Sequence, residues 1–186
     1  MIVMKFGGTS VESADAIERV ASIVERRLGE RPLVVVSAMG KTTDRLLRCA
    51  ATAAEGNRKL ALDLLRDLRD FHGNEARKLV PPAHGVALET CLEGHFQELS
   101  ELVRGLSVLG ELTPRSIDAI ASYGERLSSL IVTQAFERHG LPATLLDARR
   151  CIVTDNRHTR ASPLYEQTGK RLNEAVAPLL AAGRVP

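Results

Sequence analysis

The feature that most constrains the fold is a strand–helix–strand pattern near the start of the chain. A short apolar run, Ile2–Phe6, ends at Gly7-Gly8, and apolar residues then recur at helical spacing from about Ser13 to Arg27. Leu33–Val36 follows as a second apolar strand. Two parallel strands joined through a helix form a right-handed unit in which both strands end at the same edge of the sheet. Because ligands bind at that edge in open α/β sheets, a site is expected there.

Lys5 and the two glycines give that edge the chemistry of a phosphate site. Without a Cβ at Gly7 or Gly8, an anion can approach the backbone N–H groups. Lys5 adds a positive charge, and the next helix directs its N-terminal dipole to the same region. A glycine pair after a strand can also be no more than a turn, so this short pattern alone leaves both interpretations open.

The remaining pattern predicts an α/β protein with many helices. Leu33–Val36 is apolar on both faces, which is typical of a parallel strand covered by helices. A sheet of three or four strands would keep an open edge, so we expect a piece of a larger domain or a chain folded against a partner. The other expected elements are a helix over Thr43–Leu79 broken at Glu55–Asn57, a helix over Val86–Val103, a connector at Gly105–Gly110, a helix from Thr113-Pro114 to Phe136, strands at Ala143–Asp147 and Cys151–Val153, a polar loop over Thr154–Ser162 and a last helix from Pro163 to about Ala182.

Composition excludes several functional classes. A net charge of +2 over 186 residues is too small to indicate binding to nucleic acid or to an anionic membrane. No apolar run is long enough for a membrane span, and too few residues precede Lys5 for a signal peptide. Three widely spaced cysteines and no metal-ligand spacing argue against disulfides and metal sites and favour a cytoplasmic protein. For His72, His84, His95, His139 and His158 we expect surface or capping positions.

A second motif, Ser37-Ala38-Met39-Gly40-Lys41-Thr42-Thr43, follows the second strand. It contains Gly-Lys-Thr, but a P-loop needs a glycine five residues before Gly40, where Val35 stands. The hydroxyls of Ser37 and Thr43 can hydrogen-bond a carboxylate, whereas Thr43 can also cap the following helix.

The third motif is Gly124-Glu125, inside an otherwise helical pattern. Glycine in a helix costs roughly 1 kcal/mol relative to alanine, so close approach of a ligand or of another backbone is expected at Gly124. Glu125 is either a ligand for a cation or a solvated helix residue.

Taken together, the motifs resemble those of aspartokinases in the amino-acid-kinase family. Lys5-Phe6-Gly7-Gly8-Thr9-Ser10-Val11 resembles the opening signature of these enzymes, and Ser37–Asp44 resembles their second motif. Phe71-His72-Gly73 and Gly124-Glu125 follow in the same order. Acetylglutamate and glutamate kinases share the lysine and the glycines but not Thr-Ser-Val. The resemblance implies a three-layer αβα sandwich with a largely parallel sheet, incomplete at its C-terminal end.

The resemblance also implies a reaction and roles for single residues. The enzyme would transfer the γ-phosphoryl group of ATP, with Mg²⁺ bound through the phosphates, to the side-chain carboxylate of L-aspartate, in lysine, threonine and methionine biosynthesis. Lys5 would be catalytic and would bind the nucleotide phosphates together with Gly7, Gly8, Thr9 and Ser10. Ser37, Thr43 and Glu125 would bind aspartate, Glu125 through its ammonium group.

The chain would be the N-terminal, substrate-binding portion of such a domain. The nucleotide-binding half and any ACT domains are not among residues 1–186, so we expect these residues to be inactive alone and the full-length protein to be a homo-oligomer. A non-catalytic amino-acid-binding or split-subunit module of the same fold is the alternative.

Overall fold

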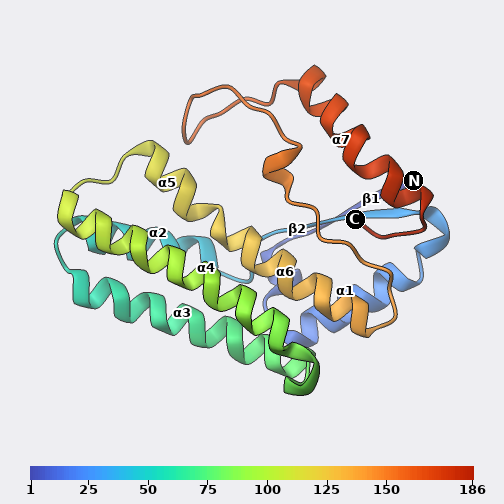
Figure 1. The fold of residues 1–186 in the computed structure, drawn as a ribbon, viewed down its shortest axis with the longest axis horizontal. Coiled ribbons are helices and arrows are strands. Elements are labelled where there is room, and N and C mark those ends of the chain that lie inside the picture. Colours follow the sequence, from blue (N-terminus) through green and yellow to red (C-terminus); the bar gives the residue numbers. More distant parts are fainter.

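A computed structural model describes the chain over residues 1–81 and 85–186; the side chains of residues 82–84, His84 among them, lie outside that description. Helices dominate, and a small parallel sheet lies at one end of an elongated helical bundle (Figure 1). The elements in chain order are β1 (Ile2–Phe6), η1 (Gly8–Val11), α1 (Ala14–Glu25), η2 (Leu28–Glu30), β2 (Pro32–Val36), α2 (Thr42–Ala54), α3 (Arg58–Leu79), α4 (Pro82–Leu109), α5 (Pro114–Ala121), α6 (Tyr123–Arg138), η3 (Ala148–Arg150) and α7 (Tyr165–Ala181).

The predicted strand–helix–strand unit is present. Strands β1 and β2 pair in parallel from Ile2 opposite Pro32 to Phe6 opposite Val36. The end of the chain continues the sheet beyond β2, because the N–H of Val34 donates to the carbonyl of Pro186 at 2.9 Å. Next to Pro186, Val185 forms a parallel bridge with Ala143. The two strands and these bridged segments therefore form one short parallel layer.

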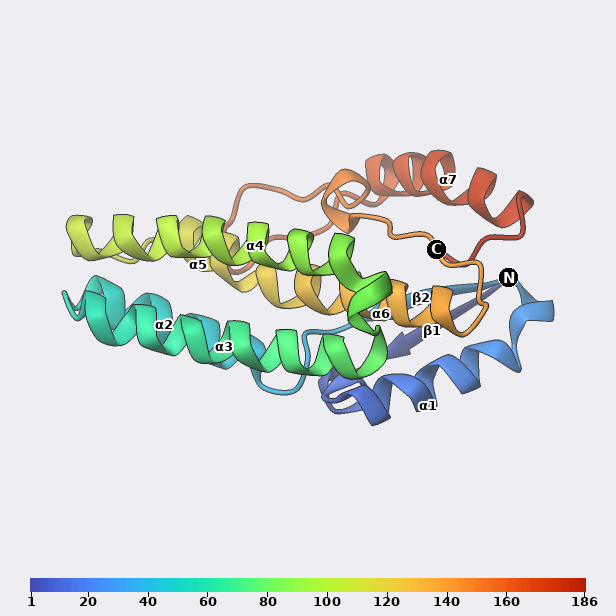
Figure 2. The same cartoon turned by 60° about the horizontal axis from the view of Figure 1, so that its bottom comes forward.

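The strands lie between α1 on one side and α7 on the other (Figure 2). Met4, Phe6, Val34 and Val36 point to the core that α1 and α6 complete. On the opposite face, Val3 of β1 is 59% and Val35 of β2 42% exposed, so the helices cover this face of the sheet only in part.

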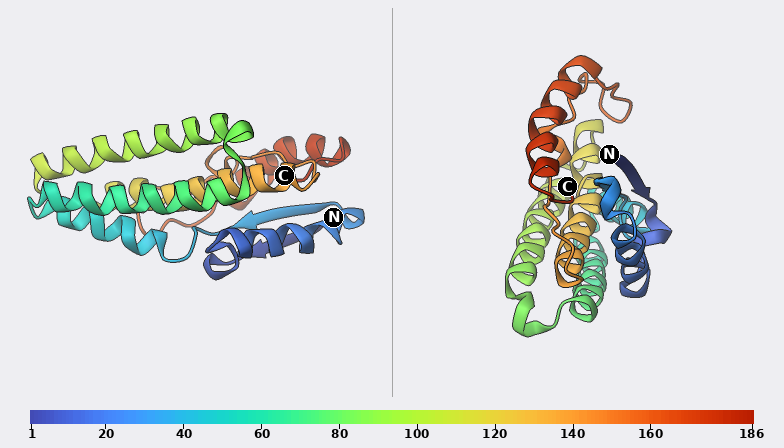
Figure 3. Two further views of the ribbon diagram at one scale, coloured as in Figure 1. Left: turned by 90° about the horizontal axis from the view of Figure 1, so that it is seen from below. Right: turned by 90° about the vertical axis from the view of Figure 1, so that its right-hand side faces the viewer.

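Helices α2, α3, α4 and α6 pack side by side in the bundle (Figure 3). The predicted break at Glu55–Asn57 separates α2 from α3 and is confirmed. Apolar side chains at helical spacing, among them Leu46, Leu68 and Leu99, are buried where these helices meet. A hydrogen bond also fixes the bundle to α1, because the buried Glu75 of α3 accepts from the N–H of Ala14 at 2.7 Å.

Several expected boundaries were wrong. Gly105–Gly110 is not a connector: α4 continues through Gly105 to Leu109 and ends at Gly110, which adopts the left-handed conformation typical of a helix end. The helix expected from Thr113 to Phe136 is broken at Ser122 into α5 and α6. The strands expected at 143–147 and 151–153 do not form: in the first stretch only Ala143 makes an isolated bridge, and the 3₁₀ turn η3 lies between the two stretches. The last helix begins at Tyr165 instead of Pro163.

Candidate active site

Lys5 lies at the carboxyl edge of the sheet, where the sequence predicts it. It is exposed on β1, and its Nζ is 3.7 Å from the position that a Cβ on Gly7 would occupy. The ammonium group therefore folds back over the glycine turn. On the neighbouring strand the chain continues into the second motif, since the N–H of Ser37 donates to the carbonyl of Phe6 at 3.0 Å. The first two motifs are thus adjacent.

Gly8 is required by packing in this structure. A Cβ at this position would lie 2.9 Å from the carbonyl oxygen of Gly40 and 3.1 Å from that of Ala38. The N–H of Gly40 also donates to the carbonyl of Gly8 at 3.0 Å, so the two motifs pack backbone against backbone. The glycine pair is therefore more than a simple turn.

Thr9 and Ser10 form the 3₁₀ turn after the glycines. The N–H of Ser10 donates to the carbonyl of Gly7 at 2.9 Å, which closes this turn. Within residues 1–81 and 85–186, no hydrogen bond occupies the N–H of Gly8 or of Thr9. These two N–H groups are the donors that the turn leaves to a ligand.

The third motif lies against the second, as the glycine predicted. A Cβ on Gly124 would be 2.7 Å from the Cβ of Ala38 and 3.2 Å from Oγ1 of Thr43. Close approach of another chain segment is the physical reason for glycine in α6. Thr43 does not cap its helix: α2 begins at Thr42, and no side chain caps it.

Glu125 reaches the loop between β2 and α2. Its Oε1 accepts a hydrogen bond from the N–H of Ala38 at 3.3 Å, across 87 residues of sequence. One turn later, the buried Ser128 donates from Oγ to the carbonyl of Ser37 at 2.6 Å. The Glu125 side chain is exposed, so one of its oxygens is fixed by Ala38 while the carboxylate remains accessible. Ser128 escaped the sequence analysis, although its spacing of four from Gly124 places both on one helix face.

A buried histidine supports the same loop. His72 on α3 was expected at the surface, but it is fully buried, and its Nδ1 donates to the carbonyl of Leu68 at 2.8 Å. Its Nε2 lies 3.5 Å from Oγ1 of Thr42, which itself donates to the carbonyl of Met39 at 2.6 Å. Burial lowers the pKa of His72 to about 4, so the ring is neutral at pH 7.

A cleft of about 410 Å³ lies on the same loop. It is lined by Glu12, Ser13, Met39, Gly40, Lys41, Thr42, Arg45 and Phe71. None of the eight predicted site residues lines it, so the cleft and the predicted site are neighbours rather than one cavity.

Two further properties concern metals and membranes. In the part of the chain that the structure describes, no three His, Cys, Asp or Glu side chains are grouped to hold a metal ion. Among the same residues, no helix combines the length and the apolarity that crossing a membrane requires.

Comparison with known proteins decides the family. The model of the amino acid kinase family matches residues 1–186. The chain belongs to the amino acid kinase family. Among curated relatives of this amino acid kinase, chloroplastic aspartokinase 2 of Arabidopsis thaliana is 35% identical over an alignment of 154 residues that covers 78% of the present chain and 26% of that protein. Chloroplastic aspartokinase 3 of the same plant is 32% identical over an alignment of 182 residues that covers 91% of the chain and 30% of the relative.

Solved structures confirm the α/β fold with its parallel sheet. Aspartokinase III of E. coli in complex with lysine and aspartate superposes with a TM-score of 0.87 at 27% identity. The same enzyme in complex with aspartate and ADP gives 0.85 at 26% identity. All of the present chain is covered in both superpositions, but only 40% and 39% of the E. coli enzyme. This amino acid kinase chain thus spans between a quarter and two fifths of these relatives.

Proposed function

We propose that residues 1–186 form the aspartate-binding part of an aspartate kinase, which transfers the γ-phosphoryl group of ATP to the side-chain carboxylate of L-aspartate. The observation that carries this proposal is the contact of Glu125 with the N–H of Ala38. Through it, an accessible carboxylate from α6 reaches the loop that follows β2, next to the strand end that carries Lys5. The similarity to aspartokinases, one of them described with aspartate and ADP, supports the same assignment.

The arrangement suits an acceptor that is both an amine and a carboxylate. Glu125 supplies negative charge for an ammonium group, while the hydroxyls of Ser37 and Thr43 supply donors for carboxylate oxygens. A plain dicarboxylate lacks the ammonium group and leaves Glu125 unpaired, which costs affinity. The site therefore selects an amino acid over its deaminated analogue.

Phosphoryl transfer to such an acceptor needs charge stabilisation more than proton transfer. A carboxylic acid with a pKa of about 4 is already ionised at pH 7, so no general base is required. A carboxylate oxygen forms the new bond to phosphorus while the bond to the ADP oxygen breaks. Lys5 and the N–H groups of Gly8 and Thr9 would stabilise the charge on the transferred group.

Mg²⁺ fits this chemistry as a partner of the nucleotide. The described residues provide no cluster of acidic ligands for it, so it would be held by the phosphates and would neutralise part of their charge. Because the chain spans at most 40% of the E. coli enzyme, turnover is expected of the gene product that contains these residues and not of residues 1–186 alone.

Isothermal titration of the chain with L-aspartate and with succinate tests the proposal. We expect aspartate to bind at least tenfold more tightly than succinate, and Glu125→Gln to remove that preference. Glu166→Gln is the matched control. Like Glu125, Glu166 is an exposed acidic residue in the first turn of a helix, but its helix, α7, is not part of the site. Equal binding of aspartate and succinate, or a Glu125→Gln variant that keeps the preference, would contradict the proposal.

The alternative, a non-catalytic amino-acid-binding module, makes a different prediction for turnover. If the alternative holds, the gene product binds aspartate, but adding aspartate does not cause it to release ADP from ATP. Detection of that release, together with 4-phosphoaspartate, excludes the module. Binding without release would assign the site to recognition alone.

A further inference from the structure

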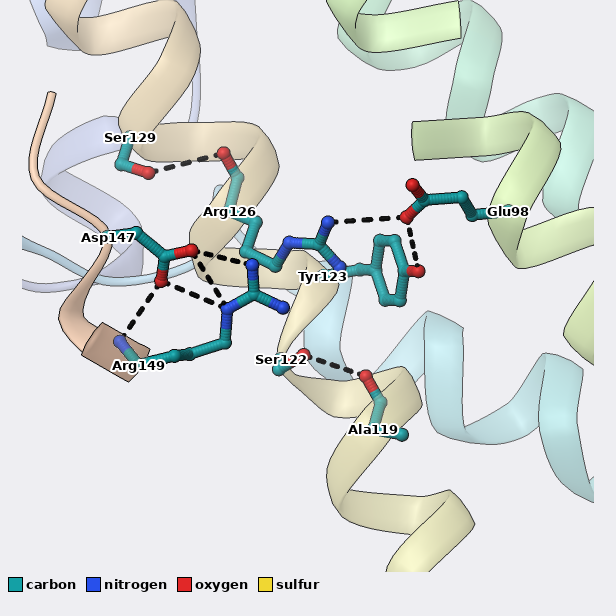
Figure 4. A network of polar contacts seen from close by, with 8 residues as sticks. All are labelled: Glu98, Ala119, Ser122, Tyr123, Arg126, Ser129, Asp147 and Arg149. Carbon is teal, nitrogen blue, oxygen red and sulfur yellow. Dashed lines mark hydrogen bonds and ion pairs between the residues drawn. The ribbon is translucent and has the colours of Figure 1, made fainter. Parts of the chain in front are cut away.

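The residue after Glu125 is an arginine, and the structure keeps the two side chains apart. An arginine next to a glutamate in sequence can pair with its carboxylate and so compete with the ammonium group of a ligand. Arg126 is instead held over the ring of Tyr123, with its guanidinium carbon 4.0 Å from the ring centroid (Figure 4). Among residues 1–81 and 85–186, Glu125 takes part in no ion pair, whereas Arg126 pairs with Glu98 at 3.3 Å.

Glu98 on α4 is therefore the acceptor that fixes Arg126. Its Oε2 receives a hydrogen bond from the Tyr123 hydroxyl at 2.7 Å as well as the one from Arg126. The two donors lower the pKa of the Glu98 carboxyl below its ordinary value, the tyrosine hydroxyl contributing most. The carboxylate is thus charged at neutral pH and holds a guanidinium whose side chain is only 18% exposed.

The other carboxylate near Arg126 is already engaged. Asp147 accepts hydrogen bonds from Arg149 at 2.6 to 3.1 Å, and Arg149 forms with it the second ion pair in the close-up view (Figure 4). These bonds leave Glu98 as the partner of Arg126. Tyr123 and Arg126 are three residues apart on α6 and share one face, which contacts α4. Gly124, on another face, packs against the loop that follows β2.

We propose that Glu98 is a positioning residue of the aspartate site: it binds Arg126, and so keeps this cation off Glu125, whose carboxylate stays available to the ammonium group of the amino acid. The inference rests on the proposed role of Glu125. On this proposal, the ion pair between Glu98 of α4 and Arg126 of α6 affects ligand affinity as well as stability.

Isothermal titration of the chain with L-aspartate tests this assignment. Glu98→Gln removes the charge that holds Arg126, and we expect aspartate to bind about five- to tenfold more weakly. The double variant Glu98→Gln with Arg126→Met removes the competing cation too, and its affinity should return to within twofold of the original. Glu93→Gln is the control on the same helix: it loses a comparable ion pair, with Arg69 at 3.4 Å, and should change affinity less than twofold.

A merely structural role for Glu98 gives the opposite result for the double variant, which would then bind aspartate as weakly as Glu98→Gln or more weakly. Normal affinity in Glu98→Gln would equally overturn the inference. Arg126→Met alone provides a test that does not depend on the folding of the other variants: we expect affinity equal to or above the original, and a fivefold loss would contradict us. If Glu125→Gln left aspartate binding unchanged, the proposed function itself would fail, which separates the two hypotheses.

Discussion

Ala38 occupies the space that a side chain on Gly124 would need: a Cβ built on Gly124 lies 2.7 Å from the Cβ of Ala38. Helix α6 and the loop after β2 approach at van der Waals distance because residue 124 has no side chain. Two hydrogen bonds accompany this contact: the N–H of Ala38 donates to Glu125, and the hydroxyl of Ser128 donates to the carbonyl of Ser37. The position of Glu125 thus depends on glycine as its neighbour.

Gly124→Ala should therefore destabilise the chain although alanine is the better helix former. The propensity gain of about 1 kcal/mol is outweighed by overpacking, which costs typically 1–3 kcal/mol, so we expect a net loss of roughly 1 kcal/mol in urea unfolding. Gly169→Ala is the control, since a Cβ there meets nothing within 4 Å and should stabilise α7 slightly. Adding Ala38→Gly to Gly124→Ala should recover part of the loss; failure to do so would assign the cost to another contact.

Lys5→Ala should abolish most turnover in the gene product and leave the fold intact. The side chain is exposed, so we expect unfolding free energy to change by no more than about 0.5 kcal/mol. The loss of a charge that stabilises the transferred phosphoryl group should lower kcat by roughly 100-fold or more. Lys41→Ala removes an exposed lysine from the neighbouring loop and should have a far smaller effect. Near-normal ADP release by Lys5→Ala would reject the catalytic role.

His72 should make stability depend on pH between about 6.5 and 4. The folded chain keeps the ring neutral to about pH 4, whereas the unfolded chain binds a proton near its ordinary value of 6.5. The contribution of His72 is thus complete above pH 6.5 and is lost as pH falls, by up to about 3 kcal/mol near pH 4.

Urea unfolding at pH 7 and pH 4.5 measures this loss. His72→Gln should reduce the difference between the two pH values. His95→Gln should retain it, because His95 makes the same hydrogen bond to the carbonyl four residues earlier, at 2.8 Å, but lies at the surface of α4. The same pH dependence in both variants would contradict the assignment.

The three thiols should differ in reactivity. Cys49 and Cys151 are buried, and burial raises the pKa of the Cys49 thiol to about 11, whereas Cys91 is exposed. Since the thiolate is the reactive form, a chromogenic disulfide reagent at pH 8 should label one thiol quickly in the native chain and three after unfolding in guanidinium. Rapid labelling of the native Cys91→Ser variant would show that a buried thiol is accessible.

The sequence predicted the parts of this site that depend on local pattern. Apolar spacing and the Gly7-Gly8 pair located β1, α1 and β2, and the parallel unit brought Lys5 and Ser37 to one edge. Gly124 was expected at a close approach, and the structure supplies the approaching residue, Ala38. These inferences held because each rests on the geometry of one or two neighbouring elements.

The features that escaped prediction depend on contacts between distant segments. His72 has the polarity of a surface residue, and only its neighbours Leu68 and Thr42 show why it is buried. No proline marks the break at Ser122, and the nearby Gly124 lies inside α6 rather than at the break. Val35 is more exposed than the apolar pattern of its strand predicts, because such a pattern indicates what a side chain prefers and not how far the neighbouring helices extend.

The separation of 87 positions between Ala38 and Glu125 has a consequence for biosynthesis. At typical ribosomal speeds of 5–20 residues per second, Ala38 is polymerised roughly 4 to 17 s before its partner. During that interval the nascent strand pair and the turn behind it can form, but Glu125 is not yet present to accept the hydrogen bond of the Ala38 N–H. The recognition of an amine that we propose for Glu125 is therefore acquired late in translation, once the sixth helix has left the exit tunnel and docked.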